Sequence, residues 1–270
     1  MVLRFRRRRL AGLRGILTGG SSGVGRALAI ALAEAGVDLV ITGRREERLR
    51  DVAHAAAGSH GRLLPLAGDI TAADFRQRLV DHANAELGGL DLVLAAAGSG
   101  AIGPFAEASP QILREIFEVD FFAPAELLRL ALPLLVAGRT PAVVLVGSIL
   151  GLHPLPLHAE YSAAKAALHG LATAIRPELA DDGVGLLLAV LGPTESAFWD
   201  NLLAGERPGW SQGRPLSAEA TAAAIVRALA AGNSTVYPGW RAKAFAGLAR
   251  LCPALIDWTV RRKRRAPHRS

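Results

Sequence analysis

The chain has 270 residues, of which 51% are hydrophobic, and this size fits one large α/β domain better than two independent domains. Its single cysteine, Cys252, excludes an internal disulfide, and no cysteine and histidine cluster has the spacing of a metal site. We therefore expect no metal and a reduced, cytoplasmic setting.

The net charge of +7 is concentrated at the two ends. Residues 1–14 hold six arginines, residues 261–270 hold six cations, and neither stretch holds an acid. Acidic residues outnumber basic ones in between, which argues against a nucleic-acid partner. The basic ends fit either solvated tails or attachment to the inner, anionic face of a membrane. Neither a targeting peptide nor a transmembrane helix is expected, because no apolar run approaches about 18 residues.

A glycine-rich turn is the first motif along the chain. The apolar pair Ile16-Leu17 leads into residues 18–25, and a helical pattern follows at 26–36. Gly19, Gly23 and Gly25 permit a tight turn and a close approach of the backbone to a phosphate, while the helix offers free N–H groups. This strand–turn–helix pattern predicts a dinucleotide phosphate site, although the same glycines also suit an ordinary loop.

The second strand, residues 37–42, bears on which dinucleotide binds. A site for NAD places an acidic residue near its end, but positions 43–45 read Gly43-Arg44-Arg45. A guanidinium group matches a ribose 2′-phosphate, so the sequence favours NADP(H), with Arg44 as its reader. The alternative is that both arginines are surface residues at the start of a helix, which we favour for Arg45.

Strands and helices then alternate to the end of the domain. Strands are predicted at 63–66, leading to Asp69 and Ile70, and at 90–94, 143–148 and 184–191, with helices at 72–87 and 109–137. Such alternation predicts a parallel, doubly wound sheet.

Three side chains are expected to converge beyond this sheet. Tyr161 and Lys165 stand four residues apart in a helical pattern, so they share one helix face, about 6 Å apart. The lysine ammonium is expected to lower the pKa of the tyrosine toward neutrality, which makes the phenol an acid/base group. Ser148 ends a buried strand, and parallel sheets bind ligands beyond the carboxyl ends of their strands.

With the glycine turn, Asp69, Ser148 and the Tyr161/Lys165 pair in this order, residues 13–240 resemble the classical short-chain dehydrogenase/reductase family. The resemblance implies one Rossmann-type α/β domain with a seven-stranded parallel sheet flanked by helices. It also implies a homodimer or homotetramer and hydride transfer between NAD(P)H and a carbonyl or alcohol. Residues 1–12 are then a basic tail and residues 241–270 a helical extension with a basic end.

The family pattern also implies residue roles. Tyr161 resembles the catalytic acid/base, Lys165 the group that binds the nicotinamide ribose, and Ser148 the donor that orients the substrate carbonyl. Asp69 and Ile70 resemble the adenine contacts. The other implied cofactor residues are Gly19, Ser21, Ser22, Gly23, Val24, Gly25, Ala96, Ala97, Gly98, Gly192, Thr194 and Ser196.

Four positions depart from the family pattern. Ala95-Ala96-Ala97-Gly98 replaces an Asn-Asn-Ala-Gly turn and loses amides beside the cofactor. Asp120 replaces an asparagine of the catalytic group, so the proton relay to Lys165 is altered, although a carboxylate there is able to hold Lys165 charged. Leu191 replaces a proline, and Ser196 conservatively replaces a threonine.

The end of the chain carries two further expectations. Residues 195–214 are expected to form a mobile cover over a hydrophobic pocket. Residues 241–270 hold apolar residues at helical spacing, interrupted by Pro253, and either cap the pocket or a subunit interface or attach to a membrane surface.

The sequence thus predicts an NADPH-dependent carbonyl reductase or alcohol dehydrogenase acting on a hydrophobic ketone or secondary alcohol. The alternative is an NADP(H)-binding module with little catalysis that acts through protein interactions, suggested by the changes at Ala95, Ala96 and Asp120.

Overall fold

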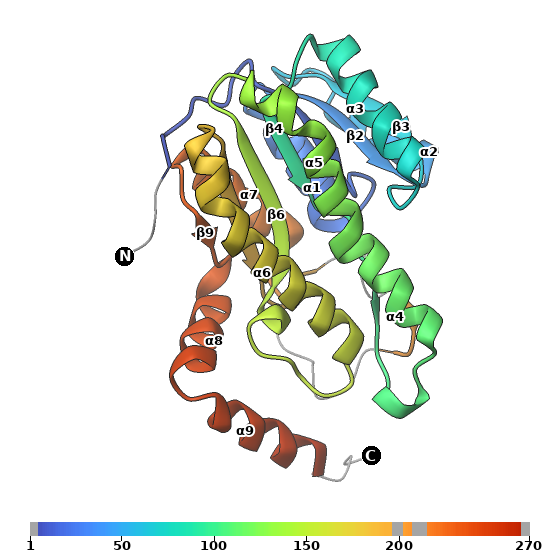
Figure 1. Ribbon diagram of the computed structural model, residues 1–270, viewed down its shortest axis with the longest axis vertical. Helices are drawn as coiled ribbons and strands as arrows, with labels where there is room; N and C mark the ends of the chain where they lie inside the picture. The colour runs from blue at the N-terminus through green and yellow to red at the C-terminus, as the bar shows by residue number, and fades with distance from the viewer. Residues whose placement is uncertain (1–4, 196–201, 207–214, 266–270) are drawn as a thin grey trace.

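The computed structural model describes residues 5–195, 202–206 and 215–265 (Figure 1). Its main sheet contains β1 (Arg14–Thr18), β2 (Asp38–Gly43), β3 (Leu63–Ala67), β4 (Leu92–Ala95), β6 (Ala142–Ser148), β7 (Gly185–Leu191) and β9 (Thr235–Val236). The longer helices are α1 (Gly23–Glu34), α2 (Glu46–Ala55), α3 (Ala73–Leu87), α4 (Pro110–Phe117), α5 (Ala123–Val136), α6 (Ala159–Asp181), α7 (Ala218–Ala230), α8 (Gly239–Leu251) and α9 (Pro253–Arg265). The predicted interruption at Pro253 is present.

All neighbouring strands of the sheet are parallel, in the order β3-β2-β1-β4-β6-β7-β9. The chain winds outward from β1 to β3, then returns to β4 on the other side of β1. This reversal opens a crevice at the carboxyl ends of β1 and β4, where open α/β sheets bind ligands. The prediction of a seven-stranded, doubly wound parallel sheet is confirmed.

Helices cover both faces of this sheet. Residues of α3, α5 and α6 pack in one apolar core, and residues of α1, α2 and α7 pack in a second core on the other side. Figure 1 looks onto the face that α5 and α6 cover. Because both faces are buried, strands such as β6 are continuous apolar runs rather than alternating ones.

The helical region predicted at 109–137 is confirmed over 110–136, but it is not a regular α-helix throughout. Between α4 and α5 lies a π-helical turn, η2 (Glu118–Phe122), which contains the buried Asp120. A one-residue surplus of this kind re-aims side chains and is frequent at functional sites. The smaller elements are β5 (Gly100–Ala101), which pairs with β8 (Leu202–Ala204), and the short helices η1 (Phe105–Glu107) and η3 (Ile149–Gly151).

From Phe5 onward, the predicted N-terminal tail lies against the domain. The Phe5 backbone N–H donates to Gly232 O at 2.6 Å. Arg8 is buried, and its guanidinium donates to the carbonyl oxygens of Leu229 at 2.7 Å and Thr140 at 3.2 Å. The expectation of a solvated tail is therefore wrong for Arg8, because backbone carbonyls of α7 and of the turn before β6 satisfy its guanidinium, whereas Arg6, Arg7 and Arg9 are exposed.

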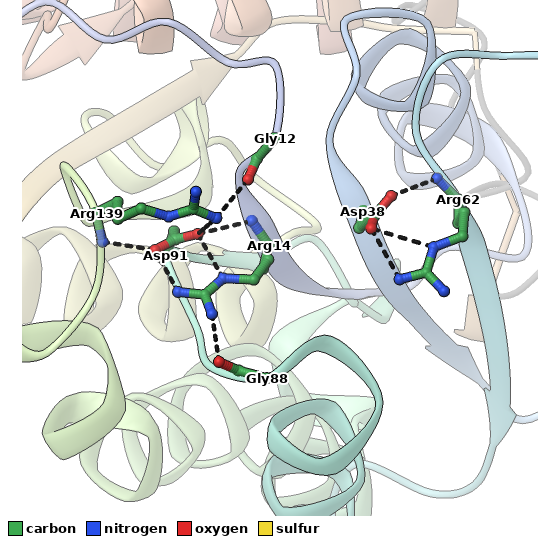
Figure 2. Close-up of polar contacts among 7 residues, drawn as sticks. All are labelled: Gly12, Arg14, Asp38, Arg62, Gly88, Asp91 and Arg139. Carbon is green, nitrogen blue, oxygen red and sulfur yellow. Dashed lines mark hydrogen bonds and ion pairs between the residues drawn. The ribbon is translucent and has the colours of Figure 1, made fainter.

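At the amino-terminal edge of the sheet, the buried carboxylate of Asp91 holds several segments together (Figure 2). It accepts hydrogen bonds from the Arg14 backbone and guanidinium at 2.9 to 3.0 Å and from the Arg139 backbone at 2.6 Å. Burial on its own raises the pKa of Asp91, but these donors outweigh burial and hold the pKa below its usual value. The cluster joins the starts of β1 and β4 to the turn after α5.

We expect Asp91→Asn to lower the free energy of unfolding by about 3 kcal/mol, because it leaves Arg14 without its buried counter-charge. Urea unfolding of both proteins measures the difference. Wild-type stabilisation from Asp91 is fully present above the pKa that this carboxyl has in the unfolded chain, and it is lost as the pH falls through the folded-state pKa.

Asp38→Asn is the matched control, because its partner Arg62 is largely exposed (Figure 2). A much smaller loss is expected there, and equal losses from the two substitutions would contradict the importance given to the buried cluster.

Candidate active site

A cavity of roughly 620 Å³ opens at the carboxyl ends of the strands. Its lining includes every predicted site residue that the structure describes. These are Gly19, Ser21, Ser22, Gly23, Val24, Gly25, Arg44, Asp69, Ile70, Ala96, Ala97, Gly98, Asp120, Ser148, Tyr161, Lys165, Gly192 and Thr194. Ser196 and most of the predicted cover at 195–214 lie outside the described residues. The fold therefore gathers residues from eight segments into one site.

The glycine turn between β1 and α1 has no room for a side chain at Gly19 or Gly25. A Cβ atom on Gly25 would lie 2.1 Å from the carbonyl oxygen of Gly19, and one on Gly19, whose φ is +72°, would lie 2.7 Å from the Ala97 nitrogen. Ser22 precedes α1, and its side chain makes no capping hydrogen bond. The exposed backbone and the free first turn of α1 fit the phosphates of a dinucleotide.

Thr18, which the sequence analysis did not single out, fixes the turn after β4. Its Oγ1 accepts hydrogen bonds from the backbone N–H groups of Ala96 and Ala97, both at 3.1 Å. The turn is thus held in place although it lacks the two asparagines of the family pattern. The sequence signal was the position of Thr18 at the end of β1, directly before the glycines.

Ser148, Tyr161 and Lys165 meet beside the cavity. Ser148 ends β6, and its Oγ accepts a hydrogen bond from Leu150 N at 3.1 Å. Tyr161 and Lys165 lie one turn apart on α6, with the lysine Nζ 5.8 Å from the centre of the tyrosine ring. The same Nζ donates to Val146 O at 3.0 Å. This is the convergence that the spacing predicted, while the catalytic roles stay predictions.

A buried ion pair lies behind these residues. Asp120 Oδ1 is 2.8 Å from Lys165 Nζ, and Asp120 Oδ2 accepts from Ser99 N at 2.9 Å and Ser99 Oγ at 3.1 Å. Burial lowers the pKa of Lys165, but the charge of Asp120, the hydrogen bond to Asp120 and the interaction with Tyr161 together outweigh burial, so the net pKa is raised. The carboxylate therefore keeps Lys165 charged, as its place in the sequence suggested. Ser99 was not foreseen.

The expected fall in the pKa of Tyr161 is wrong in direction. Burial of the half-buried phenol raises its pKa, the charge of Lys165 and a hydrogen bond with Ser148 lower it, and Asp120 raises it again. Because Asp120 offsets the charge of Lys165, burial prevails. At neutral pH Tyr161 is a neutral phenol, which is the form that donates a proton.

The two arginines after β2 both line the cavity and are both exposed. Arg45 also precedes α2, so the prediction that it begins a helix is correct, but it faces the same space as Arg44. Slight desolvation, and then the charges of Arg48 and Arg44, lower the pKa of Arg45. Two adjacent guanidinium groups at this point suit a doubly charged phosphate.

Apolar and charged residues share the rest of the lining. Ile149, Leu150, Leu155, Leu191 and Leu203 line the cavity on the side of Ser148 and β8, and Arg114, Glu115 and Glu118 of the α4 region also line it.

Comparisons with known proteins agree with this geometry. Residues 15–207 match the family model described as short chain dehydrogenase. A short chain dehydrogenase from Pseudocercospora fijiensis is 35% identical over 68% of this chain and 60% of its own length. A hydroxysteroid 11-beta-dehydrogenase 1-like protein from Macaca fascicularis is 32% identical over 93% of this chain and 87% of its own. The match thus spans about three fifths of the Pseudocercospora protein.

Solved structures show the same architecture. A short chain dehydrogenase from Burkholderia cenocepacia in complex with NADP has a TM-score of 0.80 and 26% identity, covering 94% of this chain and 99% of that one. A short chain dehydrogenase/reductase from Burkholderia phymatum in complex with NAD has a TM-score of 0.78 and 23% identity, covering 93% and 96%.

We expect Asp120→Asn to lower the pKa of Tyr161, because Asp120 no longer offsets the charge of Lys165. The chain has two tyrosines, so carbon NMR of ring-labelled protein gives two signals, with Tyr237 as an internal reference. Ser99→Ala is the control, since it removes one donor to Asp120 but keeps the charge. A Tyr161 titration that Asp120→Asn leaves unchanged would contradict this account of the site.

Proposed function

The chain belongs to the short-chain dehydrogenase family, and from this premise we propose that it is an NADPH-dependent carbonyl reductase or alcohol dehydrogenase. The substrate in this proposal is a hydrophobic ketone or secondary alcohol. One observation carries the proposal: Ser148, Tyr161 and Lys165 line the same cavity as the glycine turn. Acid/base groups and a dinucleotide cradle in one space are what hydride transfer to a carbonyl requires.

The residues of the chain supply the proton and the polarisation. The Oγ of Ser148 accepts from Leu150 N, and its side chain also shares a hydrogen bond with Tyr161, so on this proposal the two hydroxyl groups exchange that bond for bonds to the carbonyl oxygen. Negative charge grows on that oxygen as the carbonyl is reduced, and donors from Ser148 and Tyr161 bind it more strongly than the ground state. The neutral phenol of Tyr161 then gives up its proton, and the charged Lys165 stabilises the phenolate. The cofactor, when bound, supplies or accepts the hydride.

NADP(H) is the proposed cofactor. Arg44 and Arg45 line the cavity beside Asp69 and Ile70, which the family pattern assigns to the adenine. Positions 43–45, at the end of β2, hold no carboxylate to take the ribose hydroxyls of NAD. On this proposal the glycine turn holds the phosphates, and the residues from Ala96 to Gly98, with Gly192, Thr194 and Ser196, hold the nicotinamide half.

The apolar part of the lining supports a hydrophobic substrate. It consists of Ile149, Leu150, Leu155, Leu191 and Leu203. The macaque relative carries a steroid dehydrogenase name, and its match extends through most of the chain. The charged residues of the α4 region form the polar part of the same lining. Because the part beside Ser148 is apolar, we propose a substrate with an apolar body. A homodimer or homotetramer and a cytoplasmic location complete the proposal.

The alternative of a cofactor-binding module rests on Ala95, Ala96 and Asp120. Thr18 fixes the alanine turn, and Asp120 keeps Lys165 charged, so neither change removes a proton-transferring group. This favours the enzyme over the module.

Peripheral membrane attachment through residues 241–270 is a further part of the proposal. The apolar residues of α8 and α9 fall into two groups, one packed on the domain and one exposed. One face packs inward through Ala242 and Phe245 on α8 and through the buried Ile256 and Val260 on α9. The packing of this face on the domain supports the expectation that the extension caps the pocket. Among the helices that the structure describes, none combines the length and hydropathy needed to cross a bilayer.

The other face points away from the domain. Trp240, Leu251, Leu255 and Trp258 have relative exposures of 75%, 84%, 45% and 56%. Cations accompany this stripe: Arg241 lies 5.6 Å from the Trp240 ring and Arg262 lies 5.4 Å from the Trp258 ring, while Lys243 and Arg250 are exposed nearby on α8. Exposed aromatic residues with flanking cations are typical of helices that lie in the interface of an anionic membrane.

We expect Tyr161→Phe to reduce turnover by two to four powers of ten and to leave NADPH affinity near normal, because it removes only the proton donor. The loss of NADPH absorbance with ketones of increasing chain length measures turnover, and fluorescence titration measures binding. Turnover is expected to rise with chain length and to be faster with NADPH than with NADH. Tight NADPH binding without turnover on any ketone would favour the binding module, and an active Tyr161→Phe would remove Tyr161 from the mechanism.

We expect the protein to sediment with vesicles that contain phosphatidylserine and to be released by salt, because screening weakens the attraction of the cations. Replacing Leu255 and Trp258 by serine should weaken this binding roughly tenfold or more. Phe105→Ser is the matched control, since Phe105 is 74% exposed on η1, outside the C-terminal helices. Point substitutions are preferable to deletion, because Ala242 belongs to the core. Equal sedimentation of the wild type, the Leu255 and Trp258 variant and the Phe105→Ser variant would exclude this surface as the membrane-binding site.

A further inference from the structure

The strand that carries Ser148 extends past its neighbour. The last pair between β4 and β6 is Ala95 with Leu145, but β6 continues to Ser148. Ala142 N donates to Asp91 O, so the polar groups of Ala142 face β4, and those of every second residue after it face the same side. Val146 and Ser148 therefore present backbone groups toward β4 at a point where the β4 ladder has ended.

Two side chains of α6 take the place of the missing strand. Lys165 Nζ donates to Val146 O at 3.0 Å, and the N–H of Ser148 donates to His169 Nε2 at 3.3 Å. Lys165 and His169 are one helical turn apart, so a single face of α6 satisfies both groups. His169 is buried. The position of the Ser148 backbone thus depends on an imidazole as well as on the pairing with β7.

Glycines on either side of Ser148 make room for the ring. A Cβ on Gly147 would lie 2.2 Å from His169 Nε2, and a Cβ on Gly151 would lie 2.9 Å from its Cε1. These distances are too short for any side chain at the two positions. The segment around Ser148 is therefore shaped to receive the imidazole.

From this geometry we infer that His169 is a positioning residue for Ser148. It fixes the backbone of the serine, while Leu150 N donates to the Oγ, so that the serine hydroxyl is held in one place beside Tyr161. The inference rests on the proposed function, because it gives the orientation of Ser148 a consequence for turnover. His169 has no role in binding the cofactor or transferring the proton.

The charge state of His169 agrees with this role. Burial, and then the charge of Lys165, lower the pKa of His169 to about 4, so the ring is neutral at physiological pH. Since Nε2 accepts from Ser148, the ring proton is on Nδ1, which has no hydrogen-bond partner among the described residues. A buried donor without a partner costs stability. If His169 served packing alone, nothing would compensate for the cost of its unpaired Nδ1–H.

The test compares His169→Leu with His169→Gln. Leucine has a similar volume and removes the acceptor, whereas the glutamine amide oxygen is able to accept from Ser148. We expect His169→Leu to lower kcat by on the order of tenfold or more, with NADPH affinity unchanged and thermal stability equal or higher. His169→Gln should recover part of the loss. An unchanged kcat in His169→Leu, or a loss that accompanies weaker NADPH binding and lower stability, would overturn the inference.

A second measurement separates this inference from the proposed function. Nitrogen NMR of histidine-labelled wild-type protein reads the tautomer of His169, and the expected state is a neutral ring with the proton on Nδ1 at pH 7. The assignment comes from the signal that disappears in His169→Leu. A ring protonated on Nε2 would overturn the inference whatever the activity. The expected tautomer in a protein that reduces no ketone would instead leave the contact intact and remove the proposed function.

Discussion

The buried pair of Asp120 and Lys165 is the interaction on which the candidate active site depends. Isolated charges are expensive in a protein interior, so each of the two requires the other. Their contact fixes the π-helical turn against α6, and the further bonds of Lys165 to Val146 and of Asp120 to Ser99 tie in β6 and the segment after β4. The pair also sets the charge balance around Tyr161, which is why burial decides the pKa of that phenol.

Stability and chemistry are placed at opposite edges of the sheet. At the amino-terminal edge, Asp91 and Arg14 form a network that fixes where β1 and β4 begin. At the carboxyl edge β1 and β4 end together, at the pair Thr18 and Ala95, and the glycine turn and the alanine turn follow them, whereas β6 continues to Ser148. Because β4 stops early, side chains from α6 reach backbone groups that another strand would otherwise cover. A fixed frame at one edge allows an irregular site at the other.

The C-terminal helices connect the site to the outer surface. Gly192 lines the cavity, and a Cβ there would lie 3.2 Å from the Cβ of Ala242, so α8 packs directly behind a predicted cofactor residue. On α9, Asp257 lies 3.0 Å from His153, in the segment that follows Ser148. The helices proposed to bind a membrane thus pack directly against Gly192 of the cavity and against the segment that follows Ser148, an arrangement that suits a substrate that partitions into membranes.

The sequence by itself determined the parallel sheet, the glycine turn, Ser148 and the Tyr161/Lys165 pair, because these follow from local periodicity and from spacings within one strand or helix. Only the tertiary structure decided the rest: the π turn, the rise in the pKa of Tyr161, the support from Thr18 and His169, the burial of Arg8 and the division of the C-terminal apolar residues between two faces. Each of these depends on groups distant in the chain, whose burial and mutual distances exist only after packing.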